Sequence, residues 1–133
     1  MDLSRNNISN INVLEKVKFE KLEILNLGMN NISNIDIFER VNFKYLKELY
    51  LYINNISDIN VLEKVKFEEL EVLNLNSNNI LSIKVLEKIN FKKLKKFFLT
   101  ENNILDAKII EKLPYKNIVI IAVEWLYIHL YFN

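Results

Sequence analysis

An asparagine pair followed by isoleucine recurs every 24 residues along this chain of 133 residues. The pairs are Asn6-Asn7, Asn30-Asn31, Asn54-Asn55, Asn78-Asn79 and Asn102-Asn103. The decapeptide INVLEKVKFE also occurs twice, with its copies two such steps apart. A fixed period of this length is the sequence signature of a solenoid, in which each unit buries its apolar side only against its neighbours.

A column of aligned apolar residues sets the repeat boundaries. Leu22, Leu46, Leu70, Leu94 and Ile118 keep the step of 24, so we expect no insertion or deletion between them. We expect residues 1–133 to form one repeat domain, with a partial repeat at 1–21 and a degenerate C-terminal repeat at 118–133. The four full repeats are 22–45, 46–69, 70–93 and 94–117.

Within each unit the apolar period changes along the chain. The segment LKELYLY alternates around Leu49 and Leu51, which predicts a strand with one buried face. The apolar spacing of the later segment INVLEKV is typical of one or two helical turns. Asn60 and Glu63 have the spacing of a capping box. The equivalent pairs in the earlier units are Asn12 with Glu15 and Asp36 with Glu39.

The segments LEILNLGMNNISNI, LKELYLYINNISDI and LEVLNLNSNNILSI resemble the leucine-rich-repeat signature L-x-x-L-x-L-x-x-N-x-I. The repeat length and the I-S-D-I ending resemble the short-repeat branch, which includes bacterial internalins and phosphatase-regulating proteins. The resemblance implies an α/β solenoid, a right-handed arc with a concave parallel β-sheet and short helices on the convex side. It also implies a spine of phenylalanines and a buried ladder of Asn6, Asn30, Asn54, Asn78 and Asn102.

The residue inventory argues against catalysis. The chain has no cysteine, a single histidine (His129) and a single glycine (Gly28), so no thiolate zinc site or glycine-rich phosphate loop is possible. The glutamates that recur with the repeat lie beside Lys or Arg, and we interpret them as a solvated convex surface. We therefore expect no enzyme activity, no metal and no cofactor, although a fold alone does not exclude catalysis.

The charge balance argues against a nucleic-acid partner. The net charge is only +1, and the basic stretch from Lys92 to Lys96 is interrupted by Leu94, a predicted core position. We interpret this stretch as a solvated rim. The absence of cysteine-rich caps, which extracellular animal members of the resembled family usually carry, predicts a cytoplasmic location, with a bacterial cell surface as the alternative.

The two ends of the chain lack the polar outer face that terminal repeats normally carry. The apolar segment from Ile118 to Phe132 is interrupted by Glu124 and His129 and is shorter than the roughly 20 residues that a membrane-spanning helix needs. We expect a fifth strand followed by an aberrant end there, and no membrane span. We also expect the chain to self-associate through a terminal repeat, with the C-terminal one favoured.

The exposed side of the strands is the predicted binding surface. If the leucines point inward, strand alternation places the intervening residues on the concave face. These positions vary from repeat to repeat, whereas the core and ladder positions barely change. The expected partner-binding residues are Ile24, Asn26, Met29, Glu48, Tyr50, Tyr52, Ile53, Val72, Asn74, Asn76, Lys96, Phe98 and Thr100.

Aromatic and apolar side chains at the centre of this surface have the composition of interface hot spots. The sequence therefore predicts a non-catalytic module that binds a partner protein of unspecified identity through its concave face. The alternative is a structural repeat protein that forms homo-oligomers through apolar terminal repeats.

Overall fold

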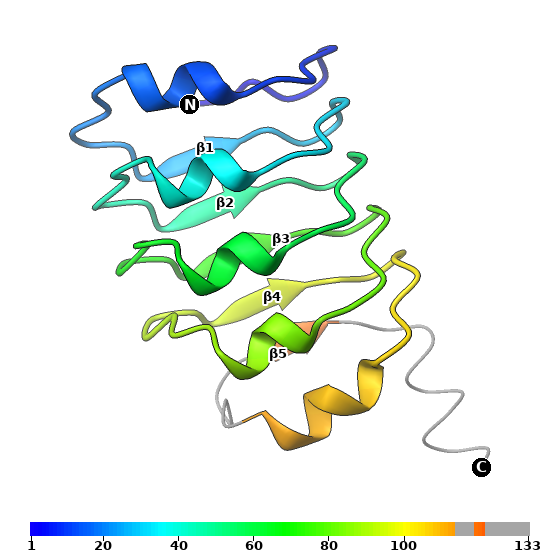
Figure 1. Ribbon diagram of the computed structural model, residues 1–133. Helices are drawn as coiled ribbons and strands as arrows, with labels where there is room; N and C mark the ends of the chain where they lie inside the picture. The colour runs from blue at the N-terminus through cyan, green and yellow to red at the C-terminus, as the bar shows by residue number, and fades with distance from the viewer. Residues whose placement is uncertain (114–118, 122–133) are drawn as a thin grey trace.

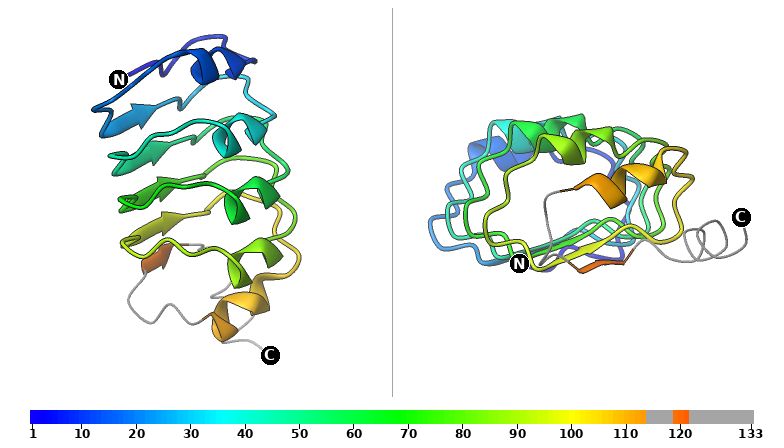
Figure 2. Two further views of the ribbon diagram at one scale, coloured as in Figure 1. Left: turned by 60° about the vertical axis from the view of Figure 1, so that its left-hand side comes forward. Right: turned by 90° about the horizontal axis from the view of Figure 1, so that it is seen from below.

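The computed structural model describes residues 1–113 and 119–121, and these form the predicted solenoid (Figure 1). Its strands build one parallel sheet in the order β1-β2-β3-β4-β5. The strands are β1 (Ile24–Asn26), β2 (Glu48–Tyr50), β3 (Val72–Asn74), β4 (Lys96–Phe98) and β5 (Val119–Ile121). Short 3-10 helices cover the opposite side of the sheet (Figure 2). They are η1 (Asn12–Lys16), η2 (Asp36–Glu39), η3 (Asn60–Glu63), η4 (Lys84–Glu87) and η5 (Ala107–Lys112).

The repeat step fixes the strand register. Leu25 of β1 lies beside Leu49 of β2, which lies beside Leu73 of β3, so equivalent residues stack in straight columns. The backbone ladder continues past the strands, because Leu27 N–H donates to the Tyr50 carbonyl at 2.8 Å. Before β1, Asp2 forms a parallel bridge with Asn26, which extends the columns by one position.

The core lies between the sheet and the helices. The leucines on the inner side of the strands, such as Leu25, Leu49 and Leu73, are fully buried, and the isoleucines after each asparagine pair face the same interior. The predicted phenylalanine spine is present, with ring centroids 6.0 Å apart for Phe19 and Phe43, and with stacked rings in the next pair.

The capping-box prediction is wrong. Asn12, Asp36 and Asn60 are the first helical residues, and their helices have no side-chain cap hydrogen bond. In the first four helices, the polar side chain that organises the helix start lies two residues before the first helical residue. For example, the backbone N–H of Asn60 donates to the Asp58 carboxylate at 2.8 Å. Asn10, Asn34 and Ser82 occupy the same position in their units and accept the equivalent bond.

The expectation of an unbroken step of 24 is also wrong at the last strand. Lys96 of β4 pairs with Val119, which is one residue earlier than the aligned columns require. The local bonding also differs before this strand: Asn79 N–H bonds the Ile56 carbonyl, whereas in the last unit the Leu105 N–H bonds the Leu81 carbonyl.

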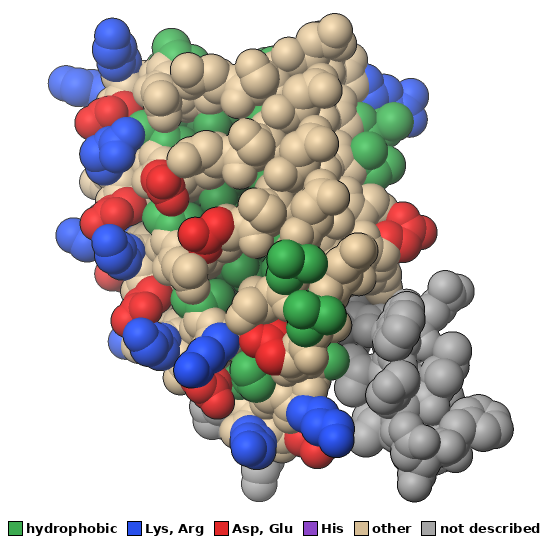
Figure 3. Space-filling model, turned by 45° about the vertical axis from the view of Figure 1, so that its right-hand side comes forward, with side chains coloured by type: hydrophobic (Ala, Val, Ile, Leu, Met, Phe, Trp, Pro, Cys, Tyr) green, Lys and Arg blue, Asp and Glu red, His purple; other side chains and the backbone are tan. Residues whose placement is uncertain are grey.

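Ion pairs join neighbouring repeats outside the core. Glu15, Glu39 and Glu63 each pair with a base 25 residues later, which is Arg40, Lys64 or Lys88. Lys93 and Lys95 of the basic stretch pair with Glu69 and Glu71, in agreement with a solvated rim. Figure 3 shows such acidic and basic side chains gathered along one side of the molecule. Because these pairs are solvent-exposed, each contributes little to stability.

Candidate protein-binding face

The outward side of the strands and of the residues that follow them forms one continuous surface, here called the sheet face. Its columns are set by the strand register, in which Asn26, Tyr50, Asn74 and Phe98 lie side by side. Tyr50 and Phe98 therefore lie two strands apart, about 10 Å, with Asn74 between them. The structure brings together the predicted residues Ile24, Asn26, Met29, Glu48, Tyr50, Tyr52, Ile53, Val72, Asn74, Asn76, Lys96, Phe98 and Thr100 on this face.

The Tyr52 ring is held in place by the chain's only glycine. An added Cβ at Gly28 would lie 2.4 Å from the ring atoms Cε1 and Cζ of Tyr52, so the ring occupies the space that a side chain would fill. Gly28 is buried and Tyr52 is half-buried as a result. The ring therefore packs against the Gly28 backbone and offers an apolar surface at this point of the sheet face. The sequence signal for this contact was the single glycine, but its partner lies one repeat away.

The Tyr50 hydroxyl is also oriented within the protein. It donates a hydrogen bond to the Glu48 carboxylate at 2.7 Å, between two outward residues of the same strand. Partial burial, followed by the hydrogen bond and charge of Glu48, raises the pKa of Tyr50 to about 12. The phenol therefore stays protonated at physiological pH and keeps its donor directed at Glu48.

Asparagines supply polar groups on the same surface. The side-chain oxygens of Asn26 and Asn74 accept the backbone N–H two residues ahead at 3.0 Å. Asn76 instead reaches the neighbouring repeat and accepts the N–H of Thr100 at 2.8 Å. Within residues 1–113, the side-chain nitrogens (Nδ2) of Asn74 and Asn76 donate no hydrogen bond. These N–H groups are therefore left to donate to carbonyl groups of a partner.

A column of residues in the left-handed conformation borders the sheet face where the chain leaves each strand. It consists of Arg5, Met29, Ile53, Ser77 and Glu101, with φ values from 51° to 57°. This conformation is unfavourable for a β-branched residue such as Ile53, which is 46% exposed. Because all five units share this conformation, it belongs to the repeat turn, and at Ile53 it is combined with an exposed apolar side chain.

The ladder asparagines lie behind this column and hold the repeats together. Asn30, Asn54 and Asn78 are buried, Asn102 is half-buried and Asn6 is exposed. Asn54 shows the full pattern: it accepts the N–H of Ile32 at 2.9 Å and donates to the carbonyls of Leu27 and Leu51 at 3.0 and 3.1 Å. Asn6 differs from the expected buried ladder because it bonds only carbonyls of its own turn.

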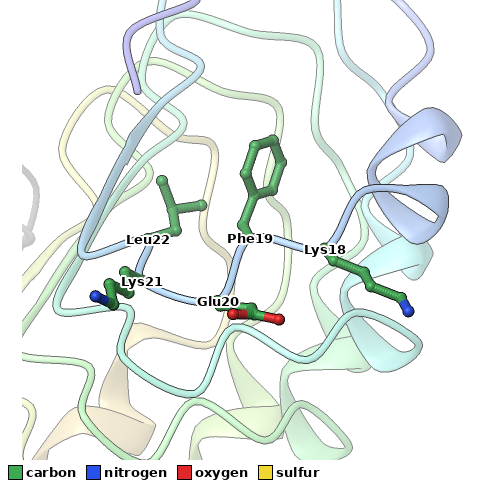
Figure 4. Close-up of a pocket in the computed structure, with 5 residues that line it drawn as sticks. All are labelled: Lys18, Phe19, Glu20, Lys21 and Leu22. Atoms are coloured by element: carbon green, nitrogen blue, oxygen red, sulfur yellow. The ribbon is translucent and has the colours of Figure 1, made fainter.

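Other features of residues 1–113 give no second site. A shallow hollow lies at the segment from Lys18 to Leu22, where Phe19 and Leu22 point to one side (Figure 4). Its lining is the uncovered edge of the phenylalanine spine.

Among the described residues, no group of acidic or histidine side chains could hold a metal ion. No helix in that part of the chain is long and apolar enough to cross a membrane. His129 and most of the apolar C-terminal segment lie outside the described residues.

No model of a known protein family matches the sequence. No curated protein sequence matches it either. Among solved structures, the crystal structure of an internalin (InlF) from Listeria monocytogenes is similar, with a TM-score of 0.70 and 28% sequence identity. The match covers 89% of this chain and 32% of the internalin chain, so this chain spans about a third of that structure. The repeat pattern, the parallel sheet and this likeness together show that the chain has a leucine-rich-repeat solenoid fold, similar to that of the internalin.

Proposed function

We propose that this chain is a non-catalytic module that binds a partner protein through its sheet face. The observation that carries the proposal is the contrast between the constant ladder and the changing residues in front of it. In the column of Asn26, Tyr50, Asn74 and Phe98 the side chains alternate between amide and aromatic, whereas the buried asparagines behind them do not change. A scaffold with one diversified face is suited to recognition.

The organisation of the aromatic side chains supports the same function. Tyr52 is held over Gly28, and Tyr50 is held by Glu48, so neither ring loses much conformational freedom when a partner binds. Phe98 adds an aromatic contact two strands from Tyr50. Aromatic anchors surrounded by polar groups are typical of the centre of an interface. The internalin likeness supports a protein-interaction repeat module in general, without indicating the partner.

The test is capture of a partner from an extract of the source organism by the immobilised chain. We expect a captured protein that is lost when Tyr50→Ala and Phe98→Ala are combined, with affinity reduced more than about tenfold for two interface aromatics. Tyr45→Ala is the matched control, because Tyr45 is exposed in the turn before β2, away from the sheet face. Equal capture by the double variant and the unchanged chain would place the binding site elsewhere.

End-to-end self-association is the second candidate function, and one observation favours it. Val13 is 61% exposed, whereas the equivalent Ile37 in the next repeat is 1% exposed, so the first layer presents core-type side chains to solvent. A second copy stacked on this layer would cover them. Val13→Lys should then reduce the solution mass, and an unchanged mass would remove this candidate.

Self-association through the C-terminal repeat stays a prediction, because residues 122–133 lie outside the described part of the chain. The location, cytoplasmic or at a bacterial cell surface, also remains a prediction.

A further inference from the structure

Two columns of the sheet face carry charges in opposite arrangements. Asp2 and Arg5 lie in the column beside β1, and Lys96 and Glu101 lie on β4 and in the turn after it, with β5 beyond them. All four side chains are exposed, and none takes part in the ion pairs found among the described residues. Hydrogen bonds from the Ser4 side chain and then from the Ser4 backbone N–H hold the pKa of the Asp2 carboxyl below its usual value, so Asp2 is charged at neutral pH.

A two-fold rotation makes this face complementary to itself. If the axis runs parallel to the strands and passes over β2, it reverses the strand order and keeps each residue at its height along the strand. Arg5 of one copy then lies opposite Glu101 of the other. Asp2 comes opposite Phe98, two residues from Lys96 on the same side of that strand. Each opposite-charge contact occurs twice in such an arrangement.

The interior columns match under the same rotation. It places β1 opposite β3 of the second copy, so Ile24 faces Val72 and Asn26 faces Asn74. Two asparagine side chains can exchange hydrogen bonds, and two aliphatic side chains can exclude water. The match arises from the sequence itself, because β1 and β3 read ILN and VLN and are separated by the same two repeat steps as the copied decapeptide.

We infer that the sheet face binds the sheet face of a second copy of this chain, with the two strand orders running in opposite directions. Ile53, Tyr50 and Tyr52 of β2 and its following turn lie at the axis and face their own counterparts. This inference rests on the proposed function, since it names one partner for the same surface. The strained, exposed Ile53 is then an apolar contact at the centre of the interface.

The contact is weak and sensitive to salt. Four strand spacings separate the two charged columns, which gives the contact a width of about 19 Å. A contact this narrow buries less than the roughly 800 Å² per partner of a standard interface. The outer charges are exposed, so salt screens them. Glu48 also meets its own counterpart near the axis, and this like-charge contact opposes pairing.

Sedimentation equilibrium of the full chain at low salt tests the inference, over concentrations from about 10 µM to about 1 mM, where a weak dimer is visible. We expect reversible dimers for the unchanged chain. Arg5→Glu alone, or Glu101→Arg alone, replaces two attractive contacts by two repulsive ones and weakens dimerisation at least about tenfold. Glu48→Gln retains an acceptor for Tyr50 and strengthens the dimer.

Restoration of complementary charge is the decisive arm. An equimolar mixture of the Arg5→Glu and Glu101→Arg chains should form mixed dimers, and one chain carrying both changes should dimerise again. Three results would each overturn the inference. The chain could be a monomer at every concentration, the single charge reversals could leave the dimerisation affinity unchanged, or the mixture could fail to form mixed dimers. None of these results affects partner capture by Tyr50 and Phe98, so the proposed function fails or stands separately. Circular dichroism of each variant verifies that the fold is retained.

Discussion

Replacing Asn54 with leucine tests how the repeats are held together. The Asn54 side chain is buried, and leucine has nearly the same shape without the polar atoms. The substitution removes the acceptor of the Ile32 N–H at 2.9 Å. It also removes the donor of the bonds to the Leu27 and Leu51 carbonyls.

The remaining bonds determine the size of the effect. The Leu27 carbonyl still accepts from Asn30, and the Leu51 carbonyl still accepts from Asn78, so neither is left without a partner. Only the Ile32 N–H loses its acceptor. An unpaired buried donor costs about 1–3 kcal/mol, and the two weakened carbonyl contacts bring the expected loss to the upper part of that range. For a chain of this size, the melting temperature should fall by about 10 °C.

Thermal unfolding followed by circular dichroism measures the change, with Asn55→Leu as the control. Asn55 is the neighbouring residue and is exposed, so the same chemical change there should alter stability by less than about 0.5 kcal/mol. Asn6→Leu should have a small effect as well, because Asn6 is exposed at the first position of the ladder. Equal melting temperatures for Asn54→Leu and Asn55→Leu would refute the ladder argument.

Three further outcomes are expected. Ile53→Asn should raise the free energy of unfolding by about 1 kcal/mol in denaturant titrations, because asparagine tolerates the left-handed conformation; a loss of stability would show that Ile53 is not strained. Gly28→Ala should change stability by less than about 1 kcal/mol but shift the NMR signals of the Tyr52 ring, since that ring must move; unchanged signals would contradict the contact. The hydrogen bond from Lys95 lowers the pKa of Glu71, and the hydrogen bonds from Ser4 lower that of Asp2. Both carboxylates therefore contribute stability above their unfolded pKa values, and this contribution is lost as the pH falls through their folded pKa values. In acid titrations Glu71→Gln should make the free energy of unfolding depend less steeply on pH, and an identical slope would show that Glu71 does not contribute.

The fold could be predicted from the sequence because each unit repeats the same signal. A strand period, an asparagine pair and a short apolar helix recur with one step, and parallel in-register stacking is the arrangement that buries them all. The helix starts were mispredicted because two polar columns compete for that role. The spacing of Asn60 and Glu63 suggested a capping box, whereas the chain uses Asp58, two residues before Asn60.

The columns of the sheet face followed from strand alternation, but its side-chain arrangement did not. Tyr52 lies over Gly28 because neighbouring repeats are stacked in register, and no single repeat contains both residues. The left-handed conformation of Met29 and Ile53 could not be predicted either, since glycine or asparagine is the usual signal for it. The pairing of Lys96 with Val119 could not be predicted, because the sequence columns keep the step of 24 through this stretch.

Site-specific photocrosslinking tests most directly whether the sheet face is the binding surface. A photoreactive phenylalanine analogue at Asn74 would lie between Tyr50 and Phe98, and the same analogue at Tyr45 would lie in an exposed turn outside the face. Irradiation in an extract of the source organism should give a discrete adduct, with a second copy or another protein, from position 74 and none from position 45. An adduct from position 45 with none from position 74 would contradict the account.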